Sequence, residues 1–147
     1  MVTWRPFGVK VAMERTITVT ADLGEREEWT APERAAELKE LATSAGAKVV
    51  EELIVRRDRI DPAFYIGSGK VEEIARNCAD KKIDAVIFNN DLSGTQQKNL
   101  EDIIRAKTID RTQLILDIFA RRAHSNEGKL QVELAQLMYL LPKLPGR

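Results

Sequence analysis

The first 110 residues alternate between short apolar runs and amphipathic stretches. Residues 16–23 alternate apolar and hydroxyl side chains, many of them β-branched, which predicts a strand. The apolar residues within 47–56 predict a second strand. Residues 85–88 are apolar throughout, as in a strand buried on both faces of a parallel sheet. A very short fourth strand is expected at 108–109.

Amphipathic helices are predicted between these strands. Thr30 and Ser93 each precede a Glu or Gln by three positions, which is the spacing of a capping box at a helix start. An apolar stripe within 71–78 indicates another helix. Strand and helix therefore alternate four times, and this predicts an α/β fold: a small four-stranded, mainly parallel sheet flanked by helices.

Asp110 precedes Gln113 by three positions and could also cap a helix. From there the pattern changes to a heptad repeat. From Leu116 to Leu141 the repeat advances in steps of four and three, the spacing of a coiled coil. We expect one long helix over about 112–141, with Gly128 as the position where it would break because glycine costs about 1 kcal/mol relative to alanine. The expected organisation is a loose segment 1–15, an α/β subdomain 16–110 and a long helix within 111–147.

Such a helix leaves an apolar seam without a partner in this chain. We call this seam the leucine stripe, and it consists of Leu130, Leu134, Leu137 and Leu141. We expect the stripe to be buried by self-association of the chain. The alternative is that the chain from Leu130 onward folds back on the sheet.

Composition adds three limits. Apolar residues make up 44% and charged residues 31% of the chain, as in a compact, well-solvated domain. No apolar run approaches the roughly 20 residues of a membrane span, so we expect no membrane partner and a cytoplasmic protein. The single cysteine and single histidine argue against a disulfide or a Cys/His metal site, so no metal is expected.

The segment 67–70, Gly-Ser-Gly-Lys, resembles part of a phosphate loop but lacks the rest of the motif. Phe64 stands where the first glycine would be, and Val71 replaces the Ser or Thr that holds magnesium. We interpret it as a glycine turn with Ser68 capping a helix, with anion binding by helix amides as the alternative. The candidate anion or ligand contacts are Gly67, Ser68, Gly69, Lys70, Arg57 and Arg111.

No enzyme site is predicted at the strand ends, because no base with an orienting partner and no nucleophile motif is present there. Charge is uneven along the chain: residues 1–110 carry a net charge of −3 and residues 111–147 a net charge of +3. Basic side chains on a helix often contact nucleic acid phosphates. The candidate RNA contacts are Arg121, Arg122 and Lys129, and a solvated helix face is the alternative interpretation.

Three segments together resemble a known family. Residues 61–74, 109–120 and 127–137 are similar to the HflX GTPases, and the resemblance covers about residues 33–145. It implies an α/β subdomain, then an antiparallel two-helix coiled coil whose first arm is the long helix, then a guanine-nucleotide-binding domain. On this resemblance the chain ends before the GTPase domain, so GTP and Mg²⁺ are expected to bind outside it and no catalytic residue is assigned.

The resemblance also implies a function on the ribosome. The expected partners are the large subunit with its RNA and the GTPase domain in cis, in subunit splitting or in rescue of stalled ribosomes. The alternative is an α/β module that binds a nucleotide or small ligand with its strand ends and the Gly67–Lys70 turn. A third hypothesis is a domain that only restrains the GTPase domain.

Overall fold

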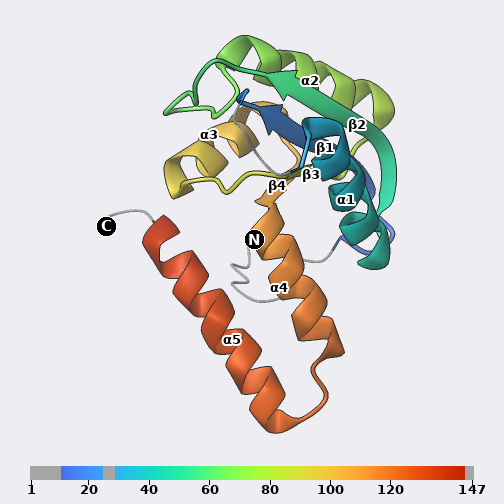
Figure 1. The fold of residues 1–147 in the computed structure, drawn as a ribbon, viewed down its shortest axis with the longest axis vertical. Helices are drawn as coiled ribbons and strands as arrows, with labels where there is room; N and C mark the ends of the chain where they lie inside the picture. Colours follow the sequence, from blue (N-terminus) through green and yellow to red (C-terminus); the bar gives the residue numbers. More distant parts are fainter. Residues whose placement is uncertain (1–10, 25–28, 145–147) are drawn as a thin grey trace.

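The computed structural model describes residues 11–24 and 29–144 and has an α/β fold, as predicted (Figure 1). Four parallel strands form one sheet in the order β2-β1-β3-β4. A helical hairpin follows β4 and extends away from the carboxyl end of that strand. The elements are β1 (Arg15–Asp22), α1 (Ala31–Ser44), β2 (Lys48–Arg56), α2 (Ser68–Lys81), β3 (Ala85–Phe88), α3 (Gly94–Ile104), β4 (Lys107–Asp110), α4 (Arg111–Arg122), α5 (Asn126–Leu140) and the 3-10 helix η1 (Leu141–Lys143).

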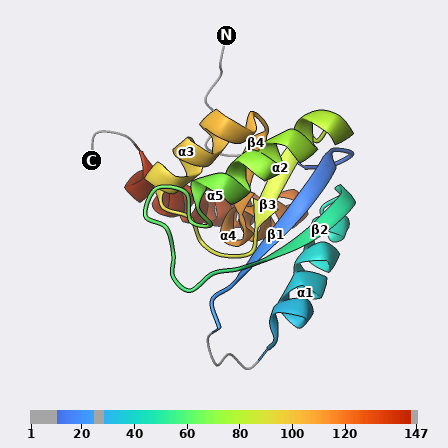
Figure 2. The ribbon, with the colours of Figure 1, turned by 90° about the horizontal axis from the view of Figure 1, so that it is seen from above.

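Helices cover both faces of the sheet (Figure 2). One core cluster joins the sheet to α2 and α3, through residues such as Ile74 and Leu100. The other joins it to α1 and α4, through residues such as Leu38 and Leu114. β3 lies between β1 and β4 and is completely buried, which confirms the prediction from its unbroken apolar run.

The start of the chain is more ordered than expected where the structure describes it. Residues 1–10 of the predicted loose segment lie outside the described residues. Val11 is completely buried in the cluster with α1 and α4, and Arg15 already belongs to β1. Among the described residues, no helix is both long and apolar enough to cross a bilayer.

Side-chain caps fix most of the helix starts. Thr30, Ser93 and Asp110 each complete a capping box, as the sequence spacing predicted. The predicted Ser68 cap is wrong: Gly67 is the N-cap of α2, with φ of 88°, and no side chain caps this helix. The chain needs a left-handed residue at that turn, which favours glycine, and the serine after it is already helical.

The predicted continuous helix over 112–141 is interrupted. α4 ends at Arg122, Ala123 is extended, and the Ser125 side chain accepts a hydrogen bond from the Gly128 amide at 2.9 Å to start α5. A side chain that caps an amide three residues on competes with the continuing helix, and here the cap prevails. Gly128 lies in the first turn of α5, so the break comes before it.

The two helices therefore form a hairpin in which α5 returns toward the sheet (Figure 1). This agrees in part with the alternative that the chain from Leu130 folds back, because the end of α5 reaches the carboxyl edge of the sheet. The leucine stripe is not buried by this return. The exposed fractions of Leu130, Leu134, Leu137 and Leu141 are 64%, 59%, 36% and 38%.

Candidate functional site

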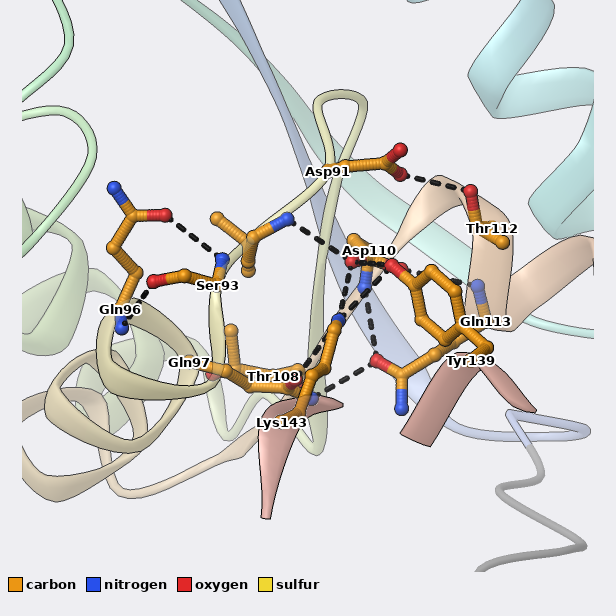
Figure 3. A network of polar contacts seen from close by, with 11 residues as sticks. Asp91, Ser93, Gln96, Gln97, Thr108, Asp110, Thr112, Gln113, Tyr139 and Lys143 are labelled. Atoms are coloured by element: carbon orange, nitrogen blue, oxygen red, sulfur yellow. Dashed lines mark hydrogen bonds and ion pairs between the residues drawn. The ribbon is translucent and has the colours of Figure 1, made fainter. Parts of the chain in front are cut away.

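Asp110 lies at the carboxyl end of β4, the edge at which open parallel sheets hold their ligands. Its carboxylate is completely buried and accepts hydrogen bonds from four groups (Figure 3). One oxygen accepts from the Gln113 amide at 3.0 Å and so caps α4. The other accepts from the Leu92 amide at 3.0 Å, the Lys143 ammonium at 2.8 Å and the Tyr139 hydroxyl.

Two of these donors come from the end of the hairpin. Tyr139 belongs to α5 and Lys143 to η1, and both side chains point toward Asp110 in Figure 3. The Lys143 ammonium also lies 4.2 Å from the centre of the Tyr139 ring, within the range of a cation–π contact. We call Asp110, Tyr139 and Lys143 the Asp110 cluster.

The cluster pairs its charges away from water. The side chain of Lys143 is 12% exposed and that of Asp110 is 0% exposed, so the ion pair is largely desolvated. Burial and the hydrogen bond to Asp110 raise the pKa of the Tyr139 hydroxyl well above its usual value. The hydroxyl therefore remains protonated at neutral pH and acts as a donor.

Amide side chains extend the cluster to two further elements. The Gln97 side-chain amide donates to the Thr108 carbonyl at 2.8 Å and to the Gln113 side chain at 2.9 Å. The Lys143 ammonium donates to the side-chain oxygen Oε1 of Gln97 at 3.3 Å. The network thus joins α3, β4, α4 and the end of the hairpin, and the chain's own side chains occupy the position near Asp110.

This arrangement suits attachment of elements better than covalent chemistry. The four donors occupy the Asp110 carboxylate and hold it in place. Within the described residues, no group of three or more His, Cys, Asp or Glu side chains has metal-binding geometry.

The predicted ligand contacts are only partly brought together. The Arg57 guanidinium lies against Gly67, with its Nη1 atom 2.7 Å from where a Cβ of Gly67 would be. Lys70 pairs with Glu73 at 3.1 Å, while Ser68 and Gly69 are exposed. Arg111 is engaged elsewhere. It bonds to Glu37 of α1 at 2.6 Å and to Asn89 at 3.4 Å, so it links α4 to α1.

The predicted RNA contacts lie at or near the hairpin turn. Arg122 ends α4, Lys129 is in the first turns of α5, and both are exposed. Arg121 is also exposed at its surface, but its guanidinium donates to the Ala45 carbonyl at the end of α1. Arg122 and Lys129 are therefore better placed than Arg121 to reach a partner.

Sequence reasoning did not find the contribution of Tyr139, Lys143 and Gln97. The one local signal was the i, i+4 spacing of Tyr139 and Lys143, which places an aromatic ring and an ammonium on one helical face. That signal did not indicate a partner for the two side chains, because a continuous helix would have carried both residues away from the sheet.

The comparisons with known proteins agree with this fold. The family description "GTP-binding GTPase N-terminal" matches residues 32–120, and "GTP-binding GTPase Middle Region" matches residues 122–147. The boundary between the two matches falls next to the break between α4 and α5. A crystal structure of a GTP-binding protein from Sulfolobus solfataricus in complex with GDP is 27% identical, with a TM-score of 0.67, over 89% of this chain and 38% of that chain.

Curated relatives narrow the class. GTPase HflX of Caldanaerobacter subterraneus subsp. tengcongensis is 56% identical over 75% of this chain and 26% of the relative. GTPase HflX of Alkalihalophilus pseudofirmus is 48% identical over 83% of this chain and 29% of the relative. The sheet, the helices around it and these matches define the N-terminal region of a GTP-binding GTPase. The chain belongs to the HflX family, and it spans less than a third of the length of these two relatives.

Proposed function

We propose that this chain is the ribosome-docking and regulatory domain of an HflX-type GTP-binding protein. Its target is the large ribosomal subunit, and the process is subunit splitting or rescue of stalled ribosomes in the cytoplasm. In such a protein, GTP and Mg²⁺ bind in the GTPase domain, outside residues 1–147. The family membership and the basic end of the hairpin support this proposal.

The observation that carries the proposal is the exposed, positively charged hairpin turn. Arg122 and Lys129 flank the turn at residues 123–125, which Figure 1 shows at the end of the hairpin farthest from the sheet. His124 is also exposed there. A narrow projection with exposed cations can approach RNA phosphates without a clash from the body of the domain.

The leucine stripe provides a second, exposed surface along α5 and the start of η1. Its heptad spacing suits a partner helix, and in the HflX family we assign that helix to the residues that connect this region with the GTPase domain. This contact in cis is the route by which nucleotide state reaches the docking domain. In the chain alone, the stripe is free to pair with a second copy.

A ligand at the Gly67–Lys70 turn is the alternative function. The position of Arg57 favours it, because a guanidinium next to the amino end of α2 places positive charge against the positive end of the helix. A bound phosphate group would relieve that repulsion. This alternative makes the strand-end residues, and not the hairpin, the part of the chain that binds a partner.

The test is co-sedimentation of the chain with purified large ribosomal subunits over a range of salt concentrations. We expect binding that weakens steeply as salt rises. Arg122→Gln and Lys129→Gln, each made singly, should weaken binding and lower the slope of log affinity against log salt by about 1. The matched control is Arg76→Gln, which removes an exposed cation from α2, at the other end of the molecule from the turn.

Each outcome has a distinct meaning. Equal weakening by Arg76→Gln would indicate general attraction to RNA and contradict docking through the turn. Binding that only an Arg57→Gln variant reduces would support the alternative site at Gly67. Absence of binding at every salt concentration would contradict the proposal that these residues dock on the ribosome.

A further inference from the structure

We propose that the Asp110 cluster is a latch. When it is closed, it fixes the end of α5 to the carboxyl edge of the sheet. When it is broken, α5 moves away from the sheet as a unit, by rotation about residues 123–125. The inference concerns the movement of the hairpin and is independent of what the hairpin binds.

Apolar packing of α5 is limited, because Val132, Tyr139 and Leu140 are only half-buried and no apolar residue of the helix is fully buried. Gln136 is the only residue of α5 that is buried, and the large apolar side chains Leu130, Leu134 and Met138 are 59% to 64% exposed. The hydrophobic contribution scales with the apolar area removed from water, and these side chains remain in water. The polar contacts at Asp110 are therefore the main attachment of the carboxyl end of the helix.

The closed form also carries a cost. The side-chain oxygen of Gln136 is buried and has no hydrogen-bond partner among the described residues. A buried acceptor without a donor is less stable than the same group in water. Opening the hairpin would hydrate this oxygen, so part of the free energy gained at the latch is offset within the same helix.

The segment that closes the latch docks where α3 begins with a glycine. A Cβ on Gly94, the first residue of α3, would lie 2.8 Å from the Lys143 Cα and 2.9 Å from its carbonyl carbon. Real side chains do not tolerate such distances to a backbone, so only glycine allows residue 143 to lie here. This contact involves no charge and is independent evidence that η1 docks on α3.

The other end of α5 is suited to act as a hinge. Residues 123–125 are outside both helices, and Ala123 is extended with φ of −76° and ψ of 123°. The first turn of α5 is capped by its own Ser125. A change of backbone angles at Ala123 therefore alters the direction of α5 without breaking the Ser125 cap.

Hydrogen exchange of the whole chain, followed by mass spectrometry, tests the latch. Lys143→Met removes the ammonium but keeps the length of the side chain. Gly94→Ala places a methyl group where the Lys143 backbone lies and alters no charge. Alanine also favours the helical conformation of α3 itself. The control is Lys98→Met, which removes a lysine from the exposed Lys98–Asp102 pair on α3.

We expect both latch variants to accelerate exchange in α5 and η1 by about tenfold or more, while β1 and β3 keep the wild-type rates. A detached helix of 15 residues is only marginally stable in water, so opening should be visible along its whole length. Wild-type rates in α5 in both variants would overturn the proposal. Equal acceleration of α5 and the strands would also overturn it, because it would show loss of global stability instead of local opening.

Discussion

At the scale of single residues, Asp110 combines a local and a long-range role. Its carboxylate caps α4 by accepting a hydrogen bond from the amide of Gln113, three positions away. It also accepts hydrogen bonds from Tyr139 and Lys143, which are 29 and 33 positions away. The same buried side chain therefore starts the hairpin and holds its end.

Cys78 gives a prediction at the same scale. Its side chain is 4% exposed, and burial, followed by repulsion from Glu51, raises the pKa of the thiol to about 11. At pH 8 only about one thiol in a thousand is then ionised, and the thiolate is the reactive form. We expect folded protein to react with Ellman's reagent only as fast as α2 opens, and unfolded protein to react at once.

The same pKa shift determines a dependence of stability on pH. In the unfolded chain the pKa of the thiol is about 8.5. Above that pH the unfolded state therefore loses protons that the folded state keeps. The contribution of Cys78 is fully present below that range and is lost as pH rises toward 11. Cys78→Ala should flatten this part of the stability curve, and an unchanged curve would contradict the assigned cause.

At the scale of elements, capping boxes were reliable because both partners lie within one turn. Thr30, Ser93 and Asp110 start the helices that their sequence spacing indicates. The heptad repeat was less reliable. Its steps of four and three continue through residues 123–125, although the chain there is not helical. The heptad pattern does not reveal a local cap such as Ser125, because the cap interrupts the helix without changing the spacing of the apolar residues.

Two serines allow a matched test of helix caps. Ser93 caps α3 through a hydrogen bond to the Gln96 amide at 3.1 Å, whereas Ser68 is the first helical residue of α2 and makes no capping bond. We expect Ser93→Ala to lower the free energy of unfolding by about 1 kcal/mol. Ser68→Ala should change it by less than about 0.5 kcal/mol. Urea unfolding measures both, and a larger effect at Ser68 would contradict the assignment of Gly67 as the cap.

At the scale of the whole molecule, the fold class was predictable because four alternations of strand and helix leave few arrangements other than a covered parallel sheet. Because the strands are parallel, Asp110 at the end of β4 lies at the edge of the sheet where ligands bind in similar folds. The occupant of that edge was not predictable. It depends on the hairpin, and therefore on a three-residue break that brings the last described segment back to the sheet.

The leucine stripe gives the prediction that belongs to this scale. The stripe remains on the surface of the folded chain, and the exposed fractions of Leu130 and Leu134 exceed one half. Burial of one leucine contributes about 1.5–3 kcal/mol, and a symmetric pair of helices buries each position twice. We therefore expect sedimentation equilibrium to show a mass that rises with concentration toward that of a dimer.

Substitutions on and beside the leucine stripe distinguish this association from non-specific hydrophobic association. Leu134→Gln should raise the dissociation constant of the dimer by about tenfold or more, because the lost burial counts in both copies. Ala135→Gln adds the same side chain at the next, also exposed, position of α5 but off the stripe, and should leave the constant unchanged. A wild-type chain that stays monomeric at high concentration would show that the exposed leucines do not pair with themselves. In that case the stripe would be specific for a helix of different sequence, such as the one assigned above to the connection with the GTPase domain.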